Sequence, residues 1–239
     1  AATMGKAMSP LRYAEAPTIQ DALNKILGGH QPASDASPYS CQLSVLLAGL
    51  LSQKGKAGTF DLAGQLTSGR ALIVGDGNLS FSLALCKLER MDPRTVLAST
   101  FETTGKVVPG TIANASRLRA LGARVMHGVD ATDLRKFVGS SKFATIMFNF
   151  PNVASRTPVY GRNPNHHLVR RFLRSAAQQL VPRGCIVVTA VDSSFYAGAF
   201  GMDAAAKFAG LPPPEAYDFR PHRFSGYSHV NTVGDGSAL

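Results

Sequence analysis

Acidic residues are scarce in this chain. Its 239 residues include 15 Asp and Glu against 25 Lys and Arg, which gives a formal net charge of +10 and an isoelectric point near 9.9. Such an excess favours a polyanionic partner, because binding releases condensed counterions, although charge alone identifies no ligand. The imbalance is strongest from residue 134 to residue 191, where nine basic residues occur without an acidic one. The composition therefore favours a nucleic acid among the partner classes.

Cysteine and long apolar runs are scarce too. The three cysteines, Cys41, Cys86 and Cys185, are far apart, and they form neither a CxxC pair nor a set with histidine at zinc-ligand spacing. The longest apolar run is interrupted by Ser44 and Gly49 and falls well short of the about 20 residues that a membrane span needs. We therefore expect reduced structural thiols, no bound metal and a soluble chain without a membrane span.

The first 69 residues differ in pattern from the rest. No acid precedes Glu15, which is typical of the remnant of a mitochondrial presequence and equally of a frayed terminus. A helix is expected over 19–27, a Pro/Ser-rich linker over 31–40, and a second helix over 41–51 that packs on the main domain. We therefore expect a helical N-terminal extension over 1–69, which could contact protein partners.

From residue 70 onward the pattern changes to short β-rich runs separated by helical ones. This alternation predicts an α/β domain over 70–239, a doubly wound and mostly parallel sheet with helices on both faces. Right-handed crossovers then place the ligand at the carboxyl ends of the strands. Strands are expected over 71–74, 95–99, 123–128, 144–149 and 185–191, and helices over 81–88, 111–121, 133–138 and 166–180.

A glycine-rich loop follows the first of these strands. Gly75 and Gly77 permit a tight turn and close backbone approach, while Asn78 or Ser80 can cap the next helix. The bare pattern GxGxxS is weak evidence. An NAD-dependent oxidoreductase fits it poorly, because its loop would place Gly or Ala where Ser80 stands.

Asp76 separates the two glycines and narrows the choice of cofactor. A carboxylate fits poorly beside a pyrophosphate but well beside a sulfonium and an α-amino group, both of which are cationic. S-adenosylmethionine carries both groups, so Asp76 favours this cofactor. The alternative is an aspartate that merely caps the following helix.

Two further acids follow the next two strands. Glu102 can accept hydrogen bonds from two ribose hydroxyls, and Asp130 can accept one from an adenine amino group. Each alone is typical of a turn. Three acids after three successive strands together indicate a nucleoside site.

The segment FNFPN follows the fourth strand, at residues 148–152. Asn149, Pro151 and Asn152 can direct a side-chain carbonyl and backbone carbonyls towards a planar N–H-bearing group in line with a methyl donor. Phe148 or Phe150 could stack on a base. The alternative is a turn that only ends the strand.

Basic residues follow this segment closely. Some lie in the next loop and others on the polar face of the next predicted helix, where they indicate a phosphate-binding rim beside the site, or a merely solvated face. The predicted RNA-binding residues are Arg156, Arg162, His166, His167, Arg170, Arg171 and Arg174.

Several motifs together resemble a known family. VGDGNLSFSLAL, GVDATDL, MFNFPN, Asn165 with HLVRRFLRSAAQQL, SSFYAG, KFAGL and RFSGYSHVNT occur in order over about residues 71–232. The chain thereby resembles the eukaryotic Rossmann-like methyltransferases that include the large-subunit rRNA uridine-N3 methyltransferase. The resemblance implies a class I methyltransferase fold, with Gly75, Asp76 and Gly77 around the methionine moiety of S-adenosylmethionine, Glu102 at its ribose and Asp130 at its adenine.

The resemblance also implies a uridine of ribosomal RNA as the substrate and ribosomal or pre-ribosomal particles as partners. It suggests the nucleolus, whereas the acid-free start suggests a mitochondrion, and both stay open. Methylation at N3 needs removal of the imide proton by a base. The family has His where this chain has Asn152, so His166 or His167 could replace it. An inactive, ribosome-bound structural factor is the alternative.

Overall fold

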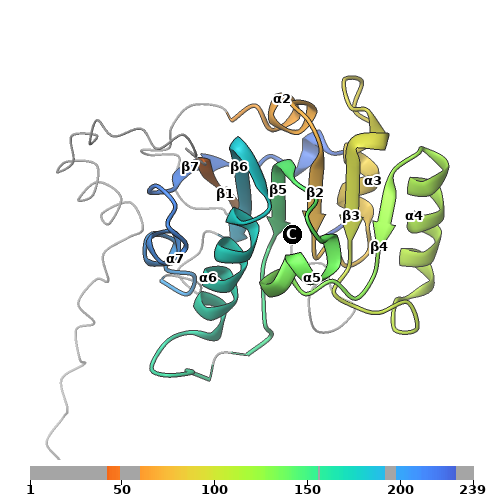
Figure 1. Cartoon of the computed structure of the whole chain (residues 1–239). Coiled ribbons are helices and arrows are strands. Elements are labelled where there is room, and N and C mark those ends of the chain that lie inside the picture. Colours follow the sequence, from red (N-terminus) through yellow and green to blue (C-terminus); the bar gives the residue numbers. More distant parts are fainter. Residues whose placement is uncertain (1–41, 49–59, 156, 192–197, 230–239) are drawn as a thin grey trace, which may run out of the picture. The chain divides into compact units, whose positions relative to one another are not determined.

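The computed structural model of the chain describes residues 42–48, 60–155, 157–191 and 198–229. Its centre is a seven-stranded sheet with the order β4-β3-β2-β5-β6-β1-β7, and each neighbouring pair is parallel. This confirms the predicted α/β class. The strands are β1 Gln42–Ala48, β2 Ala71–Val74, β3 Val96–Ser99, β4 Arg124–Met126, β5 Phe143–Asn149, β6 Leu180–Val191 and β7 Glu215–Asp218 (Figure 1).

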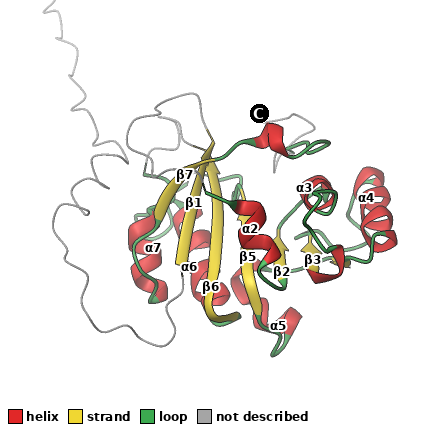
Figure 2. Cartoon of the chain, turned by 90° about the horizontal axis from the view of Figure 1, so that it is seen from above, coloured by secondary structure: helices red, strands yellow, loops and turns green. Residues whose placement is uncertain are grey.

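Successive side chains of a strand point to opposite faces of the sheet, and both faces carry apolar side chains. Helices therefore cover both faces. Leu72 and Val74 of β2 belong to the core beneath α5, α6 and α7, whereas Ala71 and Ile73 belong to the core beneath α2, α3 and α4. Figure 2 shows α7 on one side of the sheet and α2 on the other. The helices are α2 Leu62–Thr67, α3 Ser80–Leu85, α4 Pro109–Ala120, α5 Leu134–Val138, α6 Pro164–Ala177 and α7 Met202–Ala209.

The strand order reverses at β2. This strand pairs with β3 on one edge and with β5 on the other, and β3 and β5 continue the sheet in opposite directions. In open parallel sheets such a reversal opens a crevice at the carboxyl ends of the strands, where ligands bind. The glycine loop after β2 and the segment FNFPN after β5 therefore lie next to each other.

The expected helix over 41–51 is wrong, since Gln42–Ala48 forms β1. This strand pairs with β6, where Val45 lies opposite Val188, and with β7, where Leu46 lies opposite Tyr217. A strand with parallel neighbours on both edges has a nearly continuous apolar sequence, which periodicity alone does not distinguish from a buried helix. The predicted extension over 1–69 thus contributes a strand to the sheet. The expected helix over 19–27 and the linker over 31–40 lie outside the described residues.

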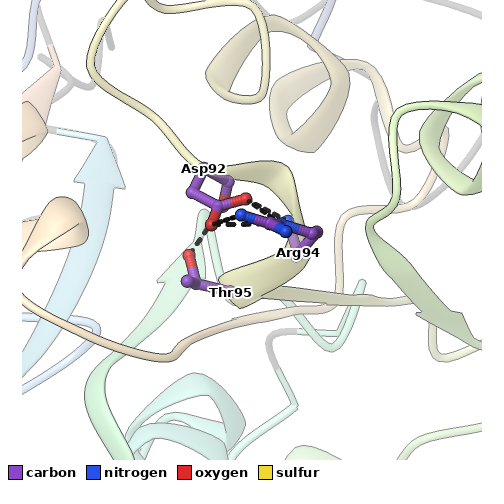
Figure 3. Close-up of polar contacts among 3 residues, drawn as sticks. All are labelled: Asp92, Arg94 and Thr95. Carbon is purple, nitrogen blue, oxygen red and sulfur yellow. Dashed lines mark hydrogen bonds and ion pairs between the residues drawn. The ribbon is translucent and has the colours of Figure 1, made fainter.

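A short turn leads into β3. Asp92 begins the 3-10 turn η1 (Pro93–Thr95), and its carboxylate accepts hydrogen bonds from the amide and the Nε of Arg94, both 3.0 Å long. The Thr95 hydroxyl donates to the Asp92 carbonyl at 2.7 Å (Figure 3). Because both charged side chains are exposed, this ion pair adds little stability and mainly defines where the strand begins.

Cys86 and Cys185 are both buried in the core. Burial raises the pKa of the Cys86 thiol to about 12, so this side chain stays protonated at neutral pH and packs as a small apolar group. Cys41 lies outside the described residues. Among the helices of the described ranges, none is long and apolar enough to cross a membrane.

Candidate functional site

The glycine loop has two glycines with different roles. Gly75 has a φ of +65°, and a Cβ there would lie 2.7 Å from a ring carbon of Phe148, so the fold itself requires glycine. A Cβ at Gly77 would have no atom within 4 Å. The Thr111 hydroxyl, on α4, donates to the Gly77 carbonyl at 3.1 Å and fixes the loop. The open space at Gly77 is therefore available to a ligand.

Asp76 is buried between the glycines and its carboxylate faces the start of α3. One carboxylate oxygen accepts hydrogen bonds from the amide and the hydroxyl of Ser82, each 2.7 Å long. Burial raises the pKa of Asp76, while the hydrogen bonds from Ser82 and Phe81 partly oppose this shift. Asp76 thus helps to cap α3, and Asn78 also has the capping role expected of Asn78 or Ser80, because its Oδ1 accepts a hydrogen bond from the Ser80 amide at 3.0 Å. Its placement beside a cationic cofactor stays a prediction.

Asn78 and Ser80 also bind a segment from the other end of the domain. The side-chain Nδ2 of Asn78 donates to the Ser228 carbonyl at 2.9 Å, and the Ser80 hydroxyl donates to the same carbonyl at 2.8 Å. The Ser228 amide in turn donates to the Ser80 hydroxyl at 3.0 Å. These contacts hold residues 227–229 over the glycine loop, an arrangement that the sequence analysis did not predict.

The acids after β3 and β4 lie at the same edge of the sheet. The side chain of Glu102 is exposed, while its carbonyl accepts a hydrogen bond from the Gly128 amide at 2.8 Å and so links the two loops. One oxygen of Asp130 accepts from the amide and the hydroxyl of Thr132, each at 2.8 Å. Glu102 therefore has a carboxylate available to a ligand, whereas Asp130 offers mainly its second oxygen.

Asn149 ends β5 with one half of its amide in use. Its Oδ1 accepts a hydrogen bond from the Thr189 hydroxyl at 2.7 Å, and its Nδ2 is buried with no partner among the described residues. A buried donor without a partner is costly, and such donors are expected where a ligand supplies the acceptor. In this orientation of the amide the available group is an N–H donor, whereas the sequence analysis expected the side-chain carbonyl.

The rest of FNFPN forms a strained turn. Phe150 and Ala154 have φ values of +50° and +54°, which non-glycine residues rarely adopt. The side-chain Oδ1 of Asn152 accepts a hydrogen bond from the Ala154 amide at 3.0 Å, so Asn152 stabilises this turn. Pro151 is buried beside it. The geometry therefore gives Asn152 a structural role and leaves Asn149 as the side chain with an unused donor.

The two phenylalanines of FNFPN point to different places. Phe148 is buried and packs edge-on against Phe172, with ring centroids 5.0 Å apart, so its proposed stacking on a base is wrong. Phe150 is only partly buried, and its ring lies 4.4 Å from the ring of His229. Phe150 is therefore the aromatic side chain of this segment that borders the site.

A buried asparagine attaches the FNFPN turn to α6. The Oδ1 of Asn165, which is 2% exposed, accepts a hydrogen bond from the Val153 amide at 2.9 Å. Asn163 caps α6 by accepting from the Asn165 amide at 2.9 Å. The start of α6 thereby fixes the position of the turn.

The two histidines of α6 bind the protein rather than the cleft. His166 is buried, its Nδ1 lies 2.9 Å from the Phe200 carbonyl, and its Nε2 lies 3.3 Å from an Arg162 nitrogen. His167 Nε2 donates to the Val159 carbonyl, because a carbonyl can only accept, at 2.8 Å. The burial of His166 contradicts its predicted contact with RNA phosphates, and neither ring is placed to replace the family histidine.

The predicted arginine rim is only partly exposed. The guanidinium of Arg170 lies 3.8 Å from the ring centroid of Phe208 on α7, and that of Arg174 lies 5.4 Å from it. These two side chains lie over the Phe208 ring, so lost packing would accompany their removal. Arg162, Arg171 and Arg174 are exposed and suited to phosphate, whereas Arg170 is partly buried. Arg156 lies outside the described residues.

His229 is the histidine that the sequence analysis overlooked. It packs on Phe150, and its Nδ1 lies 3.1 Å from the Tyr227 hydroxyl. Burial lowers the pKa of His229 below its usual value of 6.5, so the ring is neutral at physiological pH. The sequence motif that contains it, RFSGYSHVNT, gave no sign that His229 lies near the FNFPN segment. Its contact with Phe150 joins parts of the chain that are nearly 80 residues apart. No group of three or more potential metal ligands occurs within the described ranges.

The strand order and the helices on both faces define a Rossmann-like α/β protein, with the glycine loop and the FNFPN segment at its strand reversal. The family described as rRNA (uridine-N3-)-methyltransferase BTM5-like matches residues 72–231. The chain therefore belongs to the BMT5-like family.

Curated relatives are similar over part of their length. A mouse protein, the ferredoxin-fold anticodon-binding domain-containing protein 1 homolog, is 34% identical over 125 residues, which cover 50% of this chain and 19% of that protein. The Arabidopsis thaliana heavy metal-associated isoprenylated plant protein 41 is 27% identical, covering 69% of this chain and 33% of that protein. The chain thus spans about a fifth and a third of these relatives.

A third relative is of comparable length. An uncharacterized protein of Arabidopsis thaliana is 28% identical over 170 residues, covering 66% of this chain and 79% of its own. Among solved structures, a short-chain dehydrogenase from Oenococcus oeni PSU-1 is similar with a TM-score of 0.40 and 14% identity, covering 66% of this chain and 83% of that one. At this level the likeness adds nothing to the fold described from the strands.

Proposed function

We propose that this chain is an S-adenosylmethionine-dependent RNA methyltransferase that modifies N3 of a uridine in large-subunit ribosomal RNA. The observation that carries the proposal is the unpaired, buried Nδ2 of Asn149 beside the glycine loop. Val74 and Phe148 are register partners in adjacent strands, so Gly75 and Asn149 each follow directly from that pair. A methyl donor on the loop and a base bound by Asn149 would therefore meet at the same point of the edge.

The residues present fit the cofactor. The open space at Gly77 admits the methionine moiety close to the backbone, and the exposed carboxylate of Glu102 can accept hydrogen bonds from two ribose hydroxyls. Asp130 has one carboxylate oxygen left for the adenine amino group. Bound S-adenosylmethionine supplies an electrophilic methyl group on a positively charged sulfur.

The same edge fits a uracil base. Its N3 is flanked by two carbonyl oxygens, and one of them can accept the hydrogen bond that Asn149 Nδ2 leaves unmade. Holding the base by this carbonyl orients N3 towards the methyl donor. Cytosine has an amino group in place of O4, so a contact of Asn149 with O4 would also contribute to base selection, whereas a contact with O2 would not.

Loss of the N3 proton requires a base, and His229 is the neutral histidine beside Phe150. In the tautomer whose Nδ1–H donates to the Tyr227 oxygen, Nε2 is an acceptor and takes the proton from N3. Bound S-adenosylmethionine would then supply the methyl group to the electron pair freed on N3, with the carbon–sulfur bond breaking as the N–CH3 bond forms. The products would be N3-methyluridine, S-adenosylhomocysteine and a proton on His229.

The test combines cofactor binding with mapping of the methyl mark. Calorimetry on the purified chain should show binding of S-adenosylmethionine, and primer extension should detect one rRNA uridine that is modified by the wild type. The mark should disappear with Asp76→Ala and with Asn149→Ala. A mark at full level in both variants would show that this mechanism is wrong.

One observation favours a second function. Asp76 and Asn152 both stabilise turns of the chain, and Asn152 stands where the family has histidine. A methyltransferase-like subunit that serves as a ribosome-assembly or structural factor would keep these turns without turnover. Such a protein co-sediments with ribosomal particles even when it binds no cofactor, whereas absence from every ribosomal fraction would exclude this function.

A further inference from the structure

An exposed tyrosine stands at the tip of a tight turn in the part of the chain between the FNFPN segment and α6. Val159 and Arg162 form an antiparallel bridge, with reciprocal backbone hydrogen bonds of 2.8 and 3.1 Å. The two residues between them, Tyr160 and Gly161, have φ values of +50° and +71°. This is the pattern of a type I′ turn, which favours Asn-Gly and disfavours a bulky side chain at its first central position.

The Tyr160 side chain makes no packing contacts that would offset its strained backbone. Tyr160 is 95% exposed, the most exposed large apolar or aromatic side chain of the described residues. Its neighbour in space is His167, whose ring lies 6.3 Å away and approaches edge-on. A bulky residue that keeps an unfavourable positive φ without stabilising the fold is expected at a functional position.

The turn is nevertheless held firmly. The Val159 carbonyl accepts hydrogen bonds both from the Arg162 amide, at 3.1 Å, and from the His167 ring, at 2.8 Å. Arg162 also lies 3.3 Å from the buried His166. The turn is thereby anchored to the first turn of α6, the same turn from which Asn165 fixes the FNFPN segment. Tyr160 thus has a defined position relative to the proposed active site.

The surroundings of Tyr160 select its partner. Arg162 is exposed beside it, Arg171 is exposed on α6, and no acidic residue occurs from 134 to 191. A flat aromatic ring with cationic neighbours fits an unstacked nucleobase. The face of the base packs on the ring, and the backbone phosphates of the same strand contact the arginines. An apolar protein surface would instead need an apolar patch without this charge.

We propose that Tyr160 is a stacking platform for an unpaired base of the substrate RNA that lies outside the pocket of the methylated uridine. This inference rests on the proposed function, because it assigns a contact to the RNA of that reaction. It gives the enzyme a preference for a single-stranded or looped target over a duplex.

The chain contains no tryptophan, so Tyr160→Trp creates a single fluorescent reporter at the tip of the turn. Titration with single-stranded oligouridylate should quench its emission, because stacking brings a base against the indole, and an RNA duplex of equal length should quench it much less. Leu121→Trp, on an exposed residue that precedes β4 at the opposite edge of the sheet, is the control, and its emission should not change.

Affinity provides the second measurement. Tyr160→Ala should bind the single strand about 5- to 150-fold more weakly, the loss typical of one base–aromatic stack, while Tyr160→Phe should bind like the wild type. Binding of S-adenosylmethionine should be the same in all three proteins.

The outcomes separate this inference from the proposed function. If the wild type binds and methylates RNA while the emission of the Tyr160→Trp variant stays constant and Tyr160→Ala keeps full affinity, the stacking role is wrong and the proposed function stands. If the wild type binds S-adenosylmethionine but no RNA at moderate salt, both are wrong.

Discussion

The carboxylate of Asp76 accepts two hydrogen bonds from Ser82, one from its amide and one from its hydroxyl, each 2.7 Å long. The carboxylate therefore completes the first turn of α3, a role that any acceptor of the same shape could fill. A binding role for its negative charge is a separate matter. Substitutions at this residue can distinguish the two.

Asp76→Asn should keep the cap and remove the charge. Burial raises the folded pKa of Asp76 above its unfolded value, so the ionised form costs stability at pH 7, and this cost disappears as the pH falls through the folded pKa. The Asn variant should therefore be at least as stable as the wild type at pH 7 in denaturant unfolding. Asp76→Ala leaves two buried donors unmatched and should lose about 1–3 kcal/mol.

The charge itself is tested by affinity for the cofactor. If the carboxylate faces the sulfonium or the amino group, Asp76→Asn should bind S-adenosylmethionine at least about tenfold more weakly while it stays folded, because it loses one charge–charge interaction. Calorimetry on both variants gives the answer. Equal affinity in the Asn variant would reduce Asp76 to a capping residue.

The two glycines of the loop should respond in opposite ways to alanine. Gly75→Ala places a methyl group 2.7 Å from the Phe148 ring in a left-handed backbone and should lower stability by about 1–3 kcal/mol. Gly77→Ala meets no atom within 4 Å, so its unfolding free energy should change little. Its affinity for S-adenosylmethionine should nevertheless fall, because the methyl group fills the space proposed for the ligand. An unchanged affinity in Gly77→Ala would place the cofactor elsewhere.

The sequence predicted the central strands well because each is short, apolar and bounded by turn residues. The expected strand over 71–74 coincides with β2, and the expected strand over 144–149 differs from β5 by one residue. The failure at β1 has a physical cause, since the mostly apolar run over 41–51 satisfies a buried helix and a buried parallel strand equally. The strand β7 and the helix α7 were not predicted at all.

The sequence predicted where the loops of the site lie at the edge of the sheet, but it did not predict which residues they contact. Local spacing was sufficient to place Asp76, Glu102 and Asp130 after adjacent strands, because parallel strands share their carboxyl edge. It could not show that Ser228 binds Asn78 and Ser80, since that contact depends on how the last part of the domain returns over the sheet. The position of His229 depends on the same return.

Protonation of His229 should make the methylation rate fall at acidic pH, which gives the pH–rate profile an acid limb. Burial lowers its pKa below 6.5, so the ring is a proton acceptor at pH 7 and becomes protonated, and inactive as a base, only at lower pH. The kcat/KM for methylation should therefore be constant around neutral pH and fall as the pH drops through the pKa of His229. His229→Gln should reduce kcat by about 10²–10⁴-fold and abolish this limb.

Tyr227→Phe supplies the matched control for His229. It removes the hydroxyl that lies 3.1 Å from Nδ1 but leaves the ring that packs on Phe81, with centroids 5.5 Å apart. Loss of this orienting contact should weaken kcat less than His229→Gln does, and the acid limb should persist at a changed pH. A His229→Gln variant with the wild-type rate and an unaltered pH profile would exclude the histidine as the base.

Asn165 should control the position of the methylation site without contacting the substrate. Its buried Oδ1 accepts the hydrogen bond of the Val153 amide, which holds the strained turn after Phe150 against α6. Asn165→Ala leaves that amide without its partner, so stability should fall by about 1–3 kcal/mol, and kcat should fall as the turn loses its fixed position. Asn165→Asp retains an acceptor of the same shape and should recover most of the kcat.

Denaturant unfolding and single-turnover methylation at saturating cofactor measure the two effects separately. Binding of S-adenosylmethionine should be unaltered in both variants because the glycine loop is untouched. If Asn165→Ala keeps the wild-type kcat despite lower stability, the turn does not need α6 to hold the substrate.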